Sequence, residues 1–274
     1  MNNAHPAISG DLVNKTIHFI SGLPRSGSTL LCNILAQNPR FDVTSTSGIL
    51  DVLFSVRNQW NNLIEFKASP NEAAKVRVLR AMLDAYHADT DRPVVFNKSR
   101  GWLAYLEMAE LILERPAKVL VPVRDLRDVL ASFEKLWRRQ AATAQIGQEA
   151  QNYFDWQTVE GRCQVWSRID QPVGLAYNRI KDALQRGYGD RLHFVEFEQL
   201  TKNPKRALEN VYEFLGEEPF EHDFGHVAQL THEDDEIFGF RGLHHIRQKV
   251  EPMEPQWPKI LGPTADTYQG QELW

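Results

Sequence analysis

The sequence has few cysteines, no long apolar run and no excess of basic residues, and each shortage excludes a class of protein. Its 274 residues include two cysteines, Cys32 and Cys163, which argues against a disulfide framework and favours a reducing compartment. No run approaches the ~18 apolar residues of a membrane span, and the N-terminus lacks the features of a signal peptide. The formal net charge is −5, which does not indicate a nucleic-acid surface. We therefore expect a soluble, cytoplasmic protein without membrane or nucleic-acid partners.

The composition is that of an ordinary globular protein, with 42% hydrophobic and 24% charged residues. No internal repeat and no linker separates the chain into parts, so we expect one domain over residues 1–274. Residues 1–16 form a polar lead-in. Residues 217–274 contain several prolines and little periodicity, and we expect them to wrap the domain.

Short apolar segments alternate with segments of helical periodicity. This order is typical of βαβ units and predicts an α/β fold with a central parallel sheet flanked by helices. We expect strands at 17–21, 94–97, 118–123 and 192–197, and a short strand or extended loop at 41–47. Helices are expected at 28–35, 49–60, 70–87, 101–113, 125–135, 165–185 and 204–215, the penultimate one kinked or divided at Pro172.

The chemistry of the chain centres on the first strand and helix, Ile17 to Leu35. The turn between them contains Gly22 and Gly27, which allow backbone N–H groups to face inward, and the helix N-terminus adds partial positive charge. The hydroxyls of Ser26, Ser28 and Thr29 lie at the same junction. The junction is therefore suited to binding an anion.

The spacing Gly22-x4-Gly27-Ser28-Thr29 matches a nucleotide-binding P-loop, except that Ser28 stands at the position of the lysine. Without that lysine, ordinary ATP chemistry is disfavoured. A cation stands instead inside the loop at Arg25, where a guanidinium can bind a terminal phosphate or sulfate in bidentate fashion. A Gly/Ser turn with one solvated arginine is the alternative without function.

Two further cations follow predicted strands. Lys98 comes directly after VVFN, and Arg124 directly after VLVPV. Ligands of open parallel sheets bind outside the carboxyl ends of the strands, so Arg25, Lys98 and Arg124 are expected at one edge.

At these residues the chain resembles the sulfotransferases that use 3′-phosphoadenosine 5′-phosphosulfate (PAPS). GLPRSGSTLL resembles their 5′-phosphosulfate loop, particularly in the branch that includes the tyrosylprotein sulfotransferases. The resemblance implies a P-loop-like three-layer domain. It also implies a PAPS donor, transfer to a hydroxyl or amine of a small-molecule or peptide acceptor, and no required metal.

The resemblance also implies roles for individual residues. Lys98 corresponds to the lysine that contacts the bridging oxygen and sulfonate, so Lys98 and Arg25 would be catalytic. Arg124 and Ser132 would bind the 3′-phosphate. The family's basic C-terminal loop is reduced here to Arg241-Gly242, and Phe197 stands where relatives often have tyrosine near the adenosine. Donor binding is therefore expected at Arg25, Ser26, Gly27, Ser28, Thr29, Arg124, Ser132, Arg241 and Gly242.

The general base stays open. Tyrosylprotein enzymes have a glutamate soon after the first helix, where this chain offers only Asp42 and Asp51. Arg100 occupies the position of the histidine used by many cytosolic members. The base candidates are Asp51, His87, His244 and His245.

Two other functions stay open beside sulfonate transfer: a small-molecule kinase with a degenerate P-loop, and a non-catalytic module for anionic nucleotides. A Walker-B role of Asp125 would fit only the kinase. His222, His226 and His232 lack a recognised zinc spacing, so we expect solvated surface histidines and no metal site.

Overall fold

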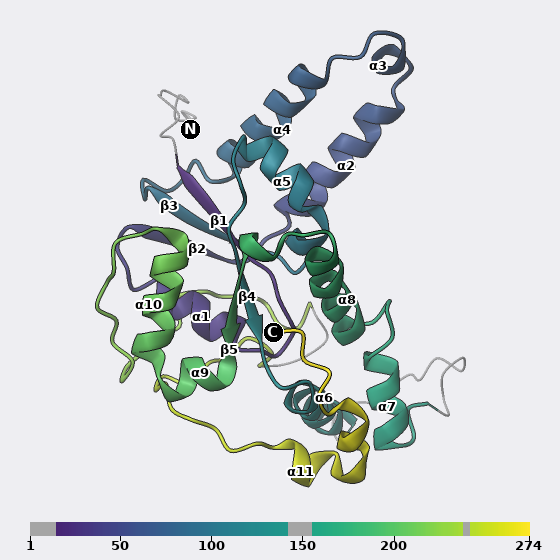
Figure 1. Ribbon diagram of the computed structural model, residues 1–274, viewed down its shortest axis with the longest axis vertical. Helices are drawn as coiled ribbons and strands as arrows, with labels where there is room; N and C mark the ends of the chain where they lie inside the picture. Colours follow the sequence, from purple (N-terminus) through teal and green to yellow (C-terminus); the bar gives the residue numbers. More distant parts are fainter. Residues whose placement is uncertain (1–14, 142–154, 238–241) are drawn as a thin grey trace, which may run out of the picture.

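The computed structural model describes residues 15–141, 155–237 and 242–274 (Figure 1). Within these residues, five parallel strands form one sheet in the order β2-β3-β1-β4-β5. The strands are β1 (Thr16–Ile20), β2 (Phe41–Thr46), β3 (Val94–Lys98), β4 (Val119–Val123) and β5 (Leu192–Glu196). The α/β fold with a central parallel sheet is therefore confirmed.

Helices cover both faces of the sheet (Figure 1). One face is covered by α1 (Ser28–Leu35), α9 (Phe197–Lys202) and α10 (Pro204–Leu215). The other face carries α2 (Ile49–Asn62), α4 (Glu72–Tyr86), α5 (Leu106–Leu113), α6 (Leu126–Ala141), α7 (Val159–Trp166) and α8 (Pro172–Gln185). The short helices α3 (Ile64–Ala68) and α11 (Trp257–Ile260) complete the set, and α2, α3 and α4 form an arm that extends from the sheet.

The central strands are buried on both faces, which is why their sequences are nearly continuous apolar runs. Every residue of β3 and β4 is buried. Strand β1 lies between them, with Ile20 opposite both Lys98 in β3 and Leu120 in β4. The residues that follow these three strands therefore begin at the same edge of the sheet.

The predicted helix at 165–185 is divided in the structure. Helix α7 ends at Trp166, and α8 begins with Pro172 at its first turn, where the missing N–H of proline costs no hydrogen bond. The strand predicted at 192–197 ends one residue earlier, at Glu196. Phe197 is instead the first residue of α9, which follows β5 directly. Helices α2, α4 and α10 lie close to the expected positions, α6 extends beyond Lys135, and α3, α9 and α11 were not predicted.

The C-terminal segment folds back over both sides of the molecule. Asn33 of α1 anchors it: its Nδ2 donates to Thr231 Oγ1 at 2.9 Å, and its Oδ1 accepts from the Thr231 amide at 3.0 Å. Farther along, Asp128 of α6 accepts from the amide of Gln256 at 2.8 Å. The ring of Trp274 stacks on Phe194 of β5. These contacts join the segment to α1, α6 and β5.

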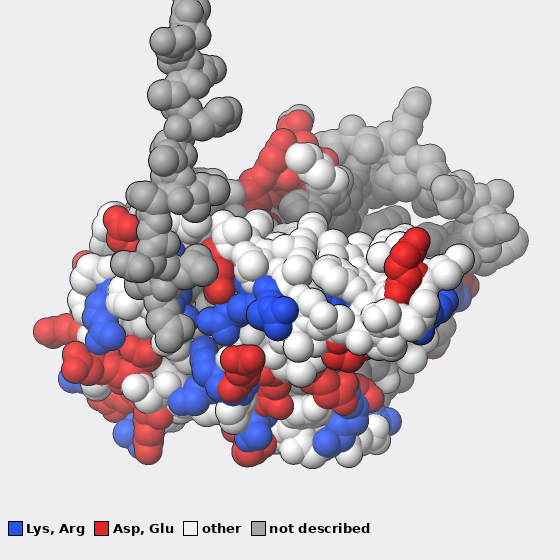
Figure 2. Space-filling model, turned by 90° about the horizontal axis from the view of Figure 1, so that it is seen from above, with Lys and Arg blue, Asp and Glu red and all other residues white. Residues whose placement is uncertain are grey.

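Charges of both signs are interspersed on the face seen in Figure 2, and neither sign dominates it. No helix within the described ranges is both long and apolar enough to cross a bilayer.

The turn after β1 depends on a close approach to β4 that only glycine allows. A Cβ on Gly22 would lie 2.2 Å from the carbonyl oxygen of Pro122. We expect Gly22→Ala to lower the free energy of unfolding by about 2–3 kcal/mol, because the two backbones must separate. Urea unfolding measures this loss. Gly48→Ala is the control, since nothing lies within 4 Å of that position; equal losses in the two variants would contradict the steric explanation.

Candidate functional site

The loop after β1 has the backbone of an anion-binding turn. Arg25 and Gly27 both adopt positive φ, at 59° and 81°, which turns successive amides toward one side. Helix α1 begins after Gly27 without a side-chain cap, so its first N–H groups and its dipole stay available to an anion. The Ser26 hydroxyl is turned inward, donating to the carbonyl oxygens of Leu23 (2.6 Å) and Pro122 (2.9 Å). This hydroxyl holds the loop against β4, so the group that Ser26 can offer to an anion is its backbone N–H.

Arg25 and Ser132 meet across the loop. The Nε of Arg25 donates to Ser132 Oγ at 3.0 Å, and its guanidinium also donates to the carbonyl oxygen of Leu243. Burial lowers the pKa of Arg25, and the nearby charges of Arg124 and Arg139 lower it further, against the opposing effect of Asp235. The guanidinium of Arg25 stays charged despite this shift, and it lies near two other arginines in a partly buried place.

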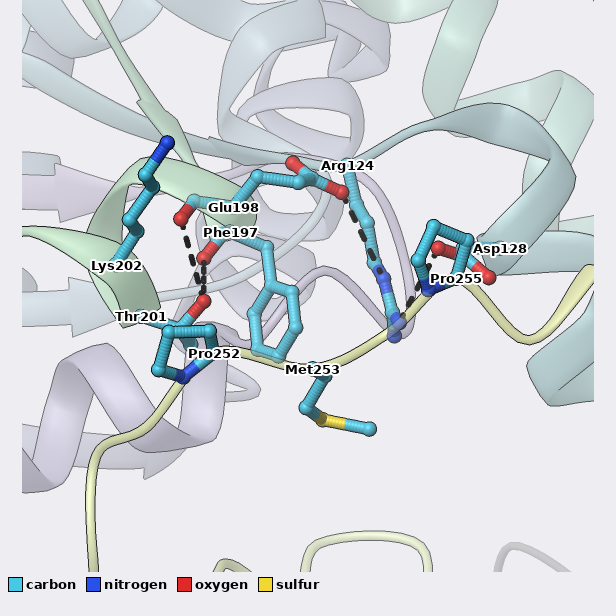
Figure 3. Close-up of a pocket in the computed structure, with 9 residues that line it drawn as sticks. All are labelled: Arg124, Asp128, Phe197, Glu198, Thr201, Lys202, Pro252, Met253 and Pro255. Atoms are coloured by element: carbon cyan, nitrogen blue, oxygen red, sulfur yellow. Dashed lines mark hydrogen bonds and ion pairs between the residues drawn. The ribbon is translucent and has the colours of Figure 1, made fainter.

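Arg124 lines a cavity of about 140 Å³ (Figure 3). Its guanidinium lies 4.4 Å from the centre of the Phe197 ring and 3.6 Å from Asp128 Oδ2. Its Nε is buried and has no hydrogen-bond partner among the described residues, although Glu198 Oε1 lies 4.0 Å away. The cavity is lined by Arg124, Asp128, Phe197, Glu198, Thr201, Lys202, Pro252, Met253 and Pro255. A buried guanidinium with an unused donor is suited to an anionic group entering this cavity.

Phe197 connects this cavity to the loop. A Cβ on Gly27 would lie only 2.5 Å from Cδ2 of the Phe197 ring, so the ring packs directly against this glycine. A planar ring here forms an apolar wall between the loop and Arg124. That this ring contacts a nucleoside stays a prediction.

Lys98 lies on the other side of the loop and is bound by a carboxylate. Its Nζ is 2.9 Å from Glu233 Oε1, and the two side chains are only 8% and 6% exposed. The same oxygen accepts from the Thr46 amide at 2.9 Å, at the end of β2. Burial raises the pKa of Glu233, but the charge of Lys98 and hydrogen bonds from Lys98 and Thr46 outweigh it, so the pKa is lowered overall.

Two residues of the C-terminal segment thus accept hydrogen bonds from two of the predicted cations. Leu243 contacts Arg25 and Glu233 contacts Lys98, and neither cation is among the residues that line the cavity of Arg124. The three cations lie at one edge of the sheet, each with its own partner, since Arg124 faces Asp128. Gly242, with φ of 70°, lies next to Leu243, and Arg241 lies outside the described residues.

The base candidates differ in position. His87 is 4% exposed, with its Nε2 at 3.1 Å from Asn97 Nδ2, and burial lowers its pKa. Asp51 lies exposed in the first turn of α2, and His245 is also exposed. His244 lies 3.2 Å from Glu233 Oε2, so it alone of the four contacts the partner of Lys98.

The sequence did not predict a role for Glu233 at the site. It occurs in an acidic run, EDDE, which by itself is typical of a solvated surface. The basic cluster that follows this run indicates that Glu233 could pair with a positive charge, but it does not indicate that the partner is Lys98.

One prediction about the histidines was wrong. His222 is buried, with its Nε2 3.0 Å from Tyr212 Oη, and burial lowers its pKa to about 4. His226 and His232 are exposed, as expected. Among the described residues, no group of three or more histidine, cysteine or acidic side chains is arranged to hold a metal ion.

The model of a family described as "Sulfotransferase family" matches residues 18–222. Mouse sulfotransferase SULT7A1, solved in complex with PAP, superposes with a TM-score of 0.54 at 13% identity, over 93% of this chain and 80% of that one. Sulfotransferase STF9 from Mycobacterium avium superposes with a TM-score of 0.51 at 12% identity, over 94% and 75%. At these identities the superpositions show a shared fold.

The pairing of Lys98 with Glu233 predicts a non-additive effect on stability. Lys98→Met leaves a buried carboxylate without its partner, and we expect a loss of about 3–5 kcal/mol in the free energy of unfolding at pH 7. The double variant Lys98→Met, Glu233→Gln removes both charges and should lose less than Lys98→Met alone. Urea unfolding of both variants and of Glu233→Gln closes the cycle. Additive losses would contradict a direct interaction between the two side chains.

Proposed function

Because the chain belongs to the sulfotransferase family, we propose that it transfers a sulfonate group from PAPS to a hydroxyl or amine of a small-molecule or peptide acceptor. The observation that carries the proposal is the meeting of Arg25 with Ser132 beside an uncapped helix N-terminus and the buried cation of Arg124. A donor with one phosphate and one phosphosulfate needs two such anion sites.

Each of the two anion sites binds one end of the donor. The amides of residues 26–29 and Arg25 bind the 5′-phosphosulfate, and Arg124 with Ser132 binds the 3′-phosphate. Phe197 lies between loop and cavity, where its ring contacts the nucleoside. The complex of the mouse sulfotransferase with PAP is consistent with a nucleotide of this class in the fold.

Transfer itself rests on fixed positive charge. The acceptor oxygen or nitrogen attacks sulfur while the bond from sulfur to the 5′-phosphate breaks, and charge develops on the departing phosphate. Lys98 and Arg25 stabilise that charge without a metal. Lys98 is an ammonium on a flexible stem, which can follow the charge as it moves from sulfonate to phosphate.

Binding of the donor requires the C-terminal segment to change its contacts. Glu233 and the Leu243 carbonyl now hold the cations that the donor would use. The 5′-phosphosulfate is the stronger partner for both, because it offers several anionic oxygens at once. We infer that Arg25 and Lys98 exchange these contacts for the donor when it enters, while the segment stays anchored to α1 through Asn33 and Thr231.

Adenosine 3′,5′-bisphosphate should bind and should raise the melting temperature more than ATP does, because ATP lacks a 3′-phosphate. We expect Arg124→Ala to weaken bisphosphate binding by about 100-fold, the loss of one or two charged hydrogen bonds at roughly 3 kcal/mol. Isothermal titration calorimetry measures both. Arg206→Ala is the control, since that arginine is exposed on α10. Equal thermal shifts with the two nucleotides would contradict the proposed donor.

Lys98→Met should lower kcat for sulfonate transfer by about 10²–10³-fold, because Lys98 stabilises charge that develops only in the transition state. Labelled PAPS, offered with phenols, alcohols, amines and tyrosine peptides, first identifies an acceptor and then gives the rates. Binding of the bisphosphate to the variant serves as the control for folding. A protein that binds the bisphosphate but transfers sulfonate to none of these acceptors would instead be a binding module.

A further inference from the structure

Glu233 lies next to the group that would be transferred. Its Oε1 is 2.9 Å from Lys98 Nζ, the cation that the proposed function assigns to the sulfonate and departing phosphate. Any sulfonate held by Lys98 therefore lies within a few ångströms of this carboxylate. An acceptor that attacks this sulfur from the side of Glu233 would bring its proton to the carboxylate.

The position of Glu233 is fixed from three elements of the fold. Asn33 of α1 binds Thr231 two residues before it, the Thr46 amide at the end of β2 donates to Oε1, and Lys98 ends β3. The side chain is 6% exposed. A carboxylate so buried is held in one orientation and has lost most of its water.

The two oxygens of Glu233 have different surroundings. Oε1 accepts from both Lys98 and Thr46, whereas Oε2 is buried and accepts no hydrogen bond from the described residues. His244 Nε2 lies 3.2 Å from Oε2, and the other ring nitrogen of His244 is held by Asp235 Oδ1 at 2.6 Å. The structure thus presents a buried oxygen with unused lone pairs and a histidine beside it.

We propose that Glu233 is the general base that activates the acceptor, with Oε2 as the atom that receives the proton. The proposal rests on the proposed function, and it supplies a glutamate base that the sequence, with only Asp42 and Asp51 soon after α1, lacks at that place. His244, oriented by Asp235, is a positioning residue that passes the proton on.

The step balances as a single displacement. The proton of the acceptor hydroxyl or amine moves to Glu233 Oε2 as the bond from acceptor to sulfur forms. The bond from sulfur to the 5′-phosphate oxygen breaks, and its electron pair leaves with the phosphate, where Lys98 meets it. The proton then passes from Glu233 to His244 Nε2 and to solvent.

Donor binding would strengthen this base. In the present structure burial raises the pKa of Glu233, and Lys98 and the hydrogen bonds outweigh that effect. Once Lys98 turns to the donor, burial remains and the pKa rises. The other groups facing Glu233 are Arg100, which follows β3, and His244 of its own segment, which is itself held by Asp235. Cys32 of α1 also faces it, and burial raises the thiol pKa to about 11, so that group stays neutral.

Calorimetry with adenosine 3′,5′-bisphosphate tests this exchange without an acceptor. Titrations at pH 5.5 in two buffers of different ionisation enthalpy give the number of protons taken up on binding. The wild-type protein should take up more protons than Glu233→Gln, and the variant should bind the bisphosphate about 3- to 10-fold more tightly, because its Lys98 has no competing anion. Asp234→Asn, with the same change of charge at an exposed neighbour, should match the wild type.

Kinetics then separate a base from a structural residue. With the acceptor from the labelled-PAPS screen, Glu233→Gln should lower kcat by at least about 10²-fold at saturating substrates, with no weakening of bisphosphate binding. The fall of kcat at acid pH in the wild type should be absent from the variant.

The outcomes distinguish the two proposals. If the bisphosphate fails to bind the wild-type protein, the proposed function is wrong. If it binds but Glu233→Gln keeps the wild-type kcat, or shows the same proton uptake as the wild type, Glu233 is not the base.

Discussion

Parallel pairing of β1 with β3 and β4 is the constraint from which the site follows. Ile20 stands opposite Lys98 on one side and Leu120 on the other, so the loop after β1 lies between the ends of both neighbours. No contact between the three cations is needed to bring them together. Hydrogen bonding of the backbone alone positions Lys98, Arg25 and Arg124 along one edge.

Charge at that edge is concentrated and then compensated. Burial lowers the pKa of Arg25, and the neighbouring charges of Arg124 and Arg139 lower it further. The C-terminal segment supplies partners for two of the three cations: Glu233 accepts a hydrogen bond from Lys98, and the carbonyl oxygen of Leu243 accepts one from Arg25. The same residues that complete the fold without donor therefore contact the groups that would bind it.

The sequence predicted the sheet, the loop and the three cations because these depend on local periodicity and on short spacings. Lys98 and Arg124 could be placed since each directly follows an apolar run. The division at Pro172 also followed from local geometry. Glu233 could not be predicted, because its position depends on how the segment returns across α1, a contact made by Asn33 and Thr231 at a separation of 198 residues. The burial of His222 likewise depends on a tertiary contact with Tyr212.

The carboxylate on Lys98 also affects how a ligand would find the protein. An unpaired lysine at a sheet edge projects a field that accelerates the arrival of polyanions and makes their association rate fall steeply with ionic strength. Here that field is cancelled at its source by Glu233 at 2.9 Å. Lys98 would therefore add little to the rate at which a nucleotide arrives, or to the dependence of that rate on salt.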